Sequence, residues 1–181
     1  MAKISSIAKT FDGLRELQGQ SDRGCAIVGA AIVHNSLKAL LISRLPVQDE
    51  TVLKMFESDS NGPLWSLGVQ IKLAHALGLV GREVLGDLNR IRDMRNKFAH
   101  FVHYKHGKQH PEGLVTFQLK IIKNWVDALN CPVDAKAVAR KRFVSACLTL
   151  RQMMDCATAG VELAPLPLEY SCLDALNDFW A

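Results

Sequence analysis

The sequence lacks the segments that mark membrane and secreted proteins. Its longest uninterrupted apolar run, Cys25 to Val33, is far shorter than the ~20 residues that span a bilayer, and Arg23 and His34 bracket it. The first residues, MAKISSIAKTFDG, have no apolar signal-peptide core. Repeats and low-complexity stretches are also missing. We therefore expect a cytoplasmic protein without membrane contact.

Paired cysteines and local metal motifs are equally scarce. The five cysteines are odd in number and contain no C-x-x-C pair: Cys25, Cys131, Cys147, Cys156 and Cys172. We expect reduced, buried thiols. Three histidines share one loop, His103, His106 and His110, but Lys105 and Lys108 would oppose a cation there. The sequence therefore predicts no metal and no cofactor.

Local catalytic signatures are missing too. The chain contains no G-x-x-x-x-G-K-[ST], G-x-G-x-x-G, G-x-S-x-G or H-E-x-x-H motif, so we expect no enzyme of those classes. The net charge of +4 is mild and permits contact with nucleic acid without arguing for it. A helix-turn-helix formed by Ala74, Gly78 and Val84 is disfavoured because Asp87 occupies a position that should be apolar. We expect no strong sequence-specific DNA binding by this chain alone.

What the sequence does contain is helical periodicity. Apolar residues make up 49% of the 181 residues and recur at helical spacing, which predicts an all-α, single-domain bundle of about seven helices over 1–160. The expected helices are ~3–18, 22–45, ~48–57, 63–78, 82–102, one ending near Leu129, and ~134–159, with a strand-like scrap at Leu114–Phe117. Residues 161–181 form a tail that contains Pro165 and Pro167 and then a short helical piece.

Two of these helices have informative starts. Ser21 and Asp22 are good N-cap residues for 22–45, and Pro63 suits the first position of 63–78. The first half of 22–45 is rich in small residues, which predicts that another helix crosses it at close range: Gly24, Ala26, Gly29, Ala30 and Ala31.

The helix 82–102 places an arginine among apolar residues. On a helical wheel Arg95 falls in the middle of an apolar stripe that comprises Val84, Leu88, Ile91, Phe98 and Val102. A buried arginine needs a partner, because an uncompensated buried charge costs several kcal/mol. We therefore expect Arg95 to be buried and paired with a carboxylate from 22–45, Asp22 above all.

A polar cluster adjoins that stripe and has two interpretations. Its members are Asp22, Arg23, Arg92, Arg95, Asn96 and His100. In the structural interpretation, Arg95 bridges helices and His100 caps or packs near the helix end. In the functional interpretation, Arg95, Asn96 and His100 line a groove.

Three blocks of sequence resemble the mannitol operon repressor family in order and spacing. They are SDRGCAIVGAAIVHNSLKALL (21–41), GPLWSLGVQIKLAHALGLV (62–80) and DLNRIRDMRNKFAH (87–100), and the resemblance covers about 10–130. It implies an all-helical bacterial protein that represses a carbohydrate operon. It also implies action through protein contacts, with another transcription factor as the partner, and not through direct reading of DNA.

A second resemblance is confined to RNKFAH (95–100), which is similar to the R-N-x-x-x-H motif of the HEPN superfamily of helical, often dimeric ribonucleases. It implies catalytic roles for Arg95, Asn96 and His100, in which the arginine stabilises phosphate charge and the histidine moves or positions a proton. The expected burial of Arg95 argues against this alternative.

Apolar residues outside the main stripes suggest surfaces for partner proteins or for a homodimer. Val144 and Leu148 lie outside the apolar sector of 134–159, whose basic residues are scattered around its axis. The tail adds Leu173 and three further anchors: Leu176, Phe179 and Trp180.

Overall fold

The computed structural model describes residues 17, 19–59, 61–100 and 135–160 of the chain. Within them the fold is all-α, with no β-strand, and consists of α2 (Asp22–Arg44), α3 (Glu50–Lys54), α4 (Leu67–Ala76), α5 (Arg82–His100) and α7 (Ala135–Thr158). Four of the expected segments fall almost entirely outside this part: the helix over ~3–18, the short strand-like segment Leu114–Phe117, the helix ending near Leu129 and the tail. The described residues thus confirm the all-α class and hold five of the seven expected helices.

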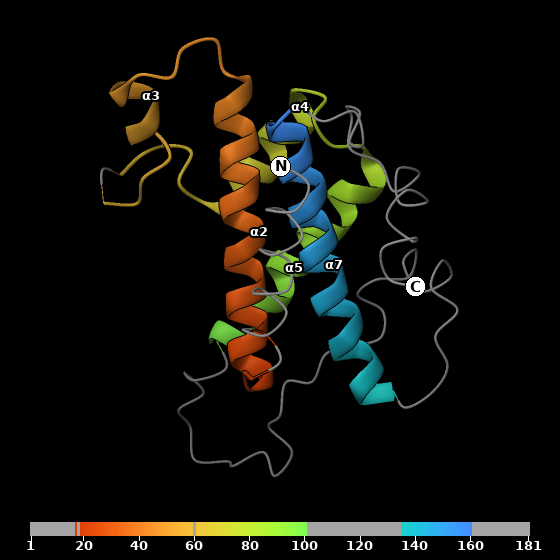
Figure 1. The fold of residues 1–181 in the computed structure, drawn as a ribbon. Helices are drawn as coiled ribbons and strands as arrows, with labels where there is room; N and C mark the ends of the chain where they lie inside the picture. Colours follow the sequence, from red (N-terminus) through yellow and green to blue (C-terminus); the bar gives the residue numbers. More distant parts are fainter. Residues whose placement is uncertain (1–16, 18, 60, 101–134, 161–181) are drawn as a thin grey trace.

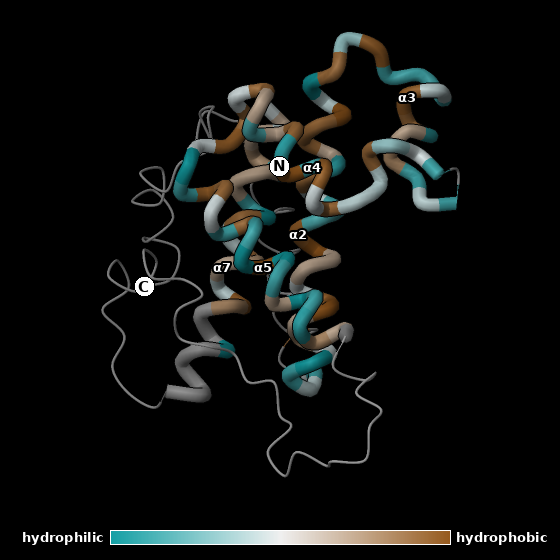
Figure 2. Tube along the Cα trace, turned by 180° about the vertical axis from the view of Figure 1, so that it is seen from behind, coloured by the Kyte–Doolittle hydropathy of each residue, from teal (hydrophilic) through white to brown (hydrophobic). Residues whose placement is uncertain are grey.

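Helix α2 is the central element of the bundle (Figure 1). It contacts α7, α5 and α4, while α3 lies on its opposite side from α7. Figure 2 shows that α2 is mostly hydrophobic and that α5 carries many hydrophilic residues. By length and composition α2 could cross a membrane, but about half of it is buried in the bundle, and a core helix of a soluble protein has the same composition.

The ends of the helices follow ordinary capping chemistry. The Ser21 hydroxyl accepts a hydrogen bond from Gly24 N at 3.1 Å, as expected for the N-cap of α2. The expected start of α4 at Pro63 is wrong, because Ser66 caps this helix and accepts from Val69 N. At its C-terminal end Gly78 has φ +69, and Leu79 N donates to Ala74 O at 2.9 Å. Helix α3 is shorter than expected.

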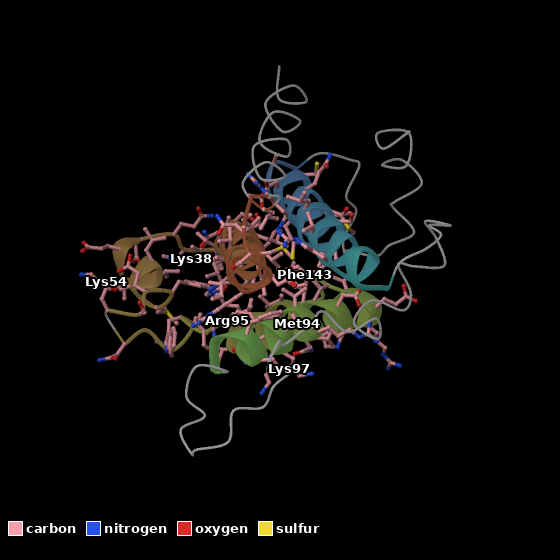
Figure 3. The ribbon with its side chains drawn as sticks, turned by 90° about the horizontal axis from the view of Figure 1, so that it is seen from below. Lys38, Lys54, Met94, Arg95, Lys97 and Phe143 are labelled. Atoms are coloured by element: carbon pink, nitrogen blue, oxygen red, sulfur yellow. The ribbon has the colours of Figure 1, made fainter. Side chains whose placement is uncertain are left out.

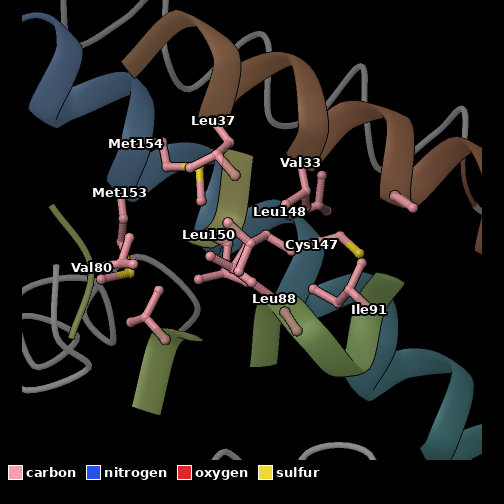
Figure 4. Packing of buried hydrophobic residues seen from close by; sticks show 14 of the residues in the cluster. Val33, Leu37, Val80, Leu88, Ile91, Cys147, Leu148, Leu150, Met153 and Met154 are labelled. Carbon is pink, nitrogen blue, oxygen red and sulfur yellow. The ribbon is translucent and has the colours of Figure 1, made fainter. Parts of the chain in front are cut away.

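Helices α2 and α7 cross at close range over Gly29. A Cβ at residue 29 would lie 2.8 Å from Cε1 of Phe143 and 3.1 Å from Sγ of Cys147. The small residues of α2 therefore permit the crossing, as the sequence predicts. Helices α2, α5 and α7 enclose a common core, in which Figure 4 shows Leu148 and Leu150 of α7 between Val33 of α2 and Leu88 of α5.

The described cysteines are free thiols, as expected. Cys25 and Cys147 are buried and Cys156 is half-buried. Burial raises the pKa of all three, most strongly for Cys147, so each is protonated at neutral pH. Cys131 and Cys172 lie outside the described residues.

Candidate functional site

Polar and aromatic side chains from two helices, α2 and α5, and from the turn before α4 meet on the side of α2 that faces away from α7. Figure 3 shows Lys38 and Arg95 on this side, with Phe143 and Met94 toward the interior. We call it the Trp65–Arg95 surface. It comprises His34 and Lys38 of α2, Trp65 just before α4, and three residues of α5: Arg92, Arg95 and Asn96.

His34 connects the three elements of this surface. Burial lowers the pKa of its imidazole, and the positive charges of Arg95 and Lys38 lower it further, while a hydrogen bond with the backbone of Trp65 opposes the shift. Its Nε2 atom is buried and has no hydrogen-bond partner among the described residues. His34 is therefore neutral at pH 7, and it lies close to a cation from α5 and another from its own helix.

Arg95 is exposed, and its expected burial is wrong. Its Nη1 donates to Oδ1 of Asn96 at 2.9 Å, and no ion pair joins it to a described carboxylate. The reason is that the buried face of α5 drifts along the helix. In the C-terminal half Met94 and Phe98 are buried, which places Arg95 at the edge of the buried face instead of its centre.

Asp22, the expected partner of Arg95, forms its ion pair with Arg140 instead. Oδ1 of Asp22 accepts from Nη1 of Arg140 at 2.8 Å, and Arg140 also donates to the backbone carbonyls of Leu17 and Gln20. This arginine of α7 therefore anchors the start of α2. Asp22 and Arg23 are exposed at that end of α2, so Asp22 serves the bundle and is not part of the Trp65–Arg95 surface.

Arg92 lies on the start of α4. A Cβ at residue 68 would be 3.1 Å from its Nη1, so the absence of a side chain at Gly68 leaves room for the guanidinium. Nη2 of Arg92 pairs with Oδ1 of Asp93 at 2.9 Å. Arg92 thus belongs to the surface but is partly neutralised, whereas Lys38 and Arg95 form no ion pair with any carboxylate in the described part of the chain.

Trp65 stands on an anchored turn. The N–H of Leu64 donates to Met55 O at 2.8 Å, and the carbonyl of Leu64 accepts from Nε2 of Gln70, also at 2.8 Å. These bonds fix the chain next to Trp65, whose side chain is nevertheless 51% exposed. A large aromatic ring held in solvent on a rigid turn is typical of a binding anchor.

The remaining predicted site residues are placed as follows. His100 is the last residue of α5, one turn beyond Asn96, and its side chain lies outside what the structure describes. Val144 and Leu148 are buried, so the prediction that they lie outside the apolar sector of α7 is wrong. Their side of α7 is covered because α2 and α5 both pack against this helix. Leu176, Phe179 and Trp180 lie outside the described residues.

Sequence reasoning missed three residues of the surface and one buried acid. His34 and Lys38 are one turn apart in a mainly apolar helix, and that spacing was the available signal. Trp65 was expected inside the helix 63–78, so its place on a turn before α4 was not predicted. Asp87, considered only as an obstacle to a helix-turn-helix, is buried and pairs with Arg90.

The surface has the chemistry of a binding site for an anionic partner. It offers two cations that pair with no described carboxylate, an amide and an exposed indole, and the partly buried, neutral imidazole of His34 lies next to them. Among the described residues no group of three or more His, Cys, Asp or Glu side chains could hold a metal ion. Comparison of the chain with protein-family models, with curated proteins and with solved structures yields no match.

Proposed function

We propose that this protein is a regulator of transcription that acts by binding another protein, and that the Trp65–Arg95 surface receives this partner. The regulatory role is supported by the resemblance to mannitol operon repressors in the blocks 21–41, 62–80 and 87–100. One structural observation carries the binding site: His34 bonds the backbone of the exposed Trp65 and lies close to Lys38 and Arg95, two cations from different helices that pair with no described carboxylate.

Direct reading of DNA fits the described helices poorly. Base readout requires an element that enters a groove with several side chains reaching base edges. Helices α2, α5 and α7 each bury one face in a common core. The cations of the surface lie on two helices, Lys38 on α2 and Arg92 and Arg95 on α5, instead of one recognition helix. We therefore assign repression to a protein partner that reads the promoter.

The test combines transcripts with promoter binding. Deletion of the gene should raise the transcripts of a carbohydrate-uptake operon, and the wild-type chain should restore repression. A folded Arg95→Glu variant should fail to restore it, whereas Lys97→Glu, at an exposed lysine of α5 outside the surface, should succeed. The purified chain should prefer the regulated promoter over scrambled DNA by less than ~100-fold at about 0.15 M salt.

Two outcomes count against this function. Unchanged transcripts in the deletion strain would show that the protein does not regulate transcription. A promoter preference of ~100-fold or more would show that the chain reads DNA itself.

The second candidate function is an RNA-binding protein or ribonuclease of the HEPN type, and one observation favours it. Arg95 is exposed and hydrogen-bonded to Asn96, so the objection that this arginine faces the core no longer holds. Cations and an exposed indole also suit phosphates and stacked bases. Incubation of the protein with RNA distinguishes this candidate from the first.

A further inference from the structure

The exposed side of α4 carries apolar residues from its first turn to its C-cap, with Lys72 and His75 exposed beside them. Val69 is 39% exposed and Leu77 47%, and Leu73 lies between them at the same four-residue spacing. Together with Trp65, these side chains form the α4 face, on which Lys72 and Ala76 are also exposed. Three of the six large exposed hydrophobic residues in the described part belong to it.

The dimensions of the α4 face suit a helix. From Val69 to Leu77 the chain advances eight residues, or about 12 Å at the helical rise of ~1.5 Å per residue, and Trp65 extends the α4 face beyond the N-terminal end of the helix. A partner helix of three to four turns covers the α4 face including Trp65. Such a helix would present its own apolar side chains at i, i+3, i+4 and i+7.

The residues from 60 to 82, which include α4, contain lysine and arginine but no acidic side chain. Lys72 is exposed on α4, Arg82 follows at its C-terminal end, and Lys38 and Arg95 lie near Trp65 at the other end. An apolar strip bordered by cations is complementary to an apolar strip bordered by carboxylates.

We propose that the α4 face binds an acidic amphipathic helix of the partner protein. The inference rests on the proposed function, because it names the chemistry of the partner at the same surface. The apolar side chains of that helix pack on Val69, Leu73 and Leu77, and the indole of Trp65 anchors one end. Its acidic side chains meet Lys72 and the cations beside Trp65.

Other occupants fit this face less well. A second copy of the chain would bring Lys72 against Lys72 across a two-fold axis, without carboxylates from α4 to compensate. A nucleic acid would leave Val69, Leu73 and Leu77 without apolar contacts. Helices that lie on membranes are rich in Lys and Arg on their polar side, whereas α4 contains one lysine and no arginine.

The test uses the full chain and two labelled synthetic peptides. Both carry the same apolar stripe over four turns, with Glu flanks in one and Lys flanks in the other, and fluorescence anisotropy reports binding. The Glu peptide should bind saturably and at least ~10-fold more tightly than the Lys peptide, and this preference should weaken as salt rises. Val69→Gln should weaken binding of the Glu peptide by ~10-fold or more. Val47→Gln, at an apolar residue of the α2–α3 loop that is 51% exposed, should leave it unchanged.

Several results would overturn the proposal. These are no saturable binding of the Glu peptide, equal binding of both peptides, and binding that Val69→Gln leaves intact. Attachment to phosphatidylglycerol vesicles that Val69→Gln abolishes would identify a lipid surface instead. Self-association that Val69→Gln disrupts, measured by sedimentation, would identify a second copy.

The two proposals fail separately. Unchanged transcripts in the deletion strain with selective binding of the Glu peptide would remove the regulatory function and leave the binding surface. Altered transcripts without binding of the Glu peptide would support the regulatory function and remove the proposed binding of an acidic helix.

Discussion

Arg140 of α7 and Asp22 of α2 form an ion pair at 2.8 Å although 117 residues separate them in the sequence. The same guanidinium donates to the carbonyls of Leu17 and Gln20, so it fixes the start of α2 against α7.

The first prediction compares two arginines. Arg140→Ala should lower the free energy of unfolding by about 1–3 kcal/mol, because it removes an ion pair and leaves carbonyls without their donor. Arg95→Ala should change it by less than ~0.5 kcal/mol, because Arg95 is exposed and bonded only to its neighbour Asn96 among the described residues. Urea unfolding measures both. A larger loss of unfolding free energy for Arg95→Ala than for Arg140→Ala would contradict the exposed position of Arg95 and would support the buried position that the helical wheel suggests.

The second prediction compares two helical glycines. Gly29→Ala should destabilise the bundle by about 1–3 kcal/mol, because the added methyl group would lie 2.8 Å from the Phe143 ring. Gly86→Ala should stabilise it by ~0.5–1 kcal/mol, because the only atom near the added methyl group is Nη1 of Arg90 at 3.9 Å and alanine favours the helix. Thermal melts measure both. Equal effects of the two substitutions would contradict the close crossing of α2 and α7.

Local features of the fold were predictable from the sequence. Ser21 as N-cap, the small residues around Gly29 and the apolar periodicity of α2 and α5 each depend on a few neighbouring residues, and each prediction agrees with the structure. The helix start predicted from Pro63 was wrong because Ser66, three residues later, is a better N-cap.

The candidate site was harder to predict because it depends on tertiary packing. A wheel with a fixed angle cannot show that the buried face of α5 moves toward Met94 and Phe98, which leaves Arg95 exposed. Nothing local indicates which of the 22 lysines and arginines lies opposite Asp22. The position of Trp65 beside His34 also requires the packing of α4 on α2.

The third prediction concerns pH and His34. Its pKa in the folded state is lowered by burial and by the charges of Arg95 and Lys38, so the unfolded chain binds the proton more tightly. The corresponding stability is intact above the unfolded pKa of about 6.5, and it is lost as pH falls through the lower folded pKa. His34→Gln should therefore lose less stability than the wild type between about pH 7.5 and pH 5 in urea unfolding.

A companion measurement checks the cause. The NMR titration of His34 should show a higher pKa in Arg95→Gln than in the wild type, because one of the charges that lowers it has been removed. Lys97→Gln, at an exposed lysine of the same helix, is the matched control and should leave the pKa in place. An unchanged pKa of His34 in Arg95→Gln would show that the charge of Arg95 does not act on His34.

The fourth prediction is that the purified chain leaves both a structured and an unstructured RNA intact. The proposed function assigns Lys38 and Arg95 to a protein partner, and Arg95 already donates to Asn96 of its own helix. Degradation that persists in His100→Ala protein indicates a contaminating nuclease. Degradation that disappears in His100→Ala and Arg95→Ala proteins would make the ribonuclease the correct function.

The central claim is that a protein partner binds the Trp65–Arg95 surface. Site-specific photo-crosslinking in the native host tests it most directly, with the photoreactive residue placed at position 65 and, as a control, at exposed Leu53 of α3. We predict one protein adduct from position 65 that is absent from position 53 and lost when Arg95→Glu is added. RNA adducts at position 65, or the same adducts at both positions, would contradict the account.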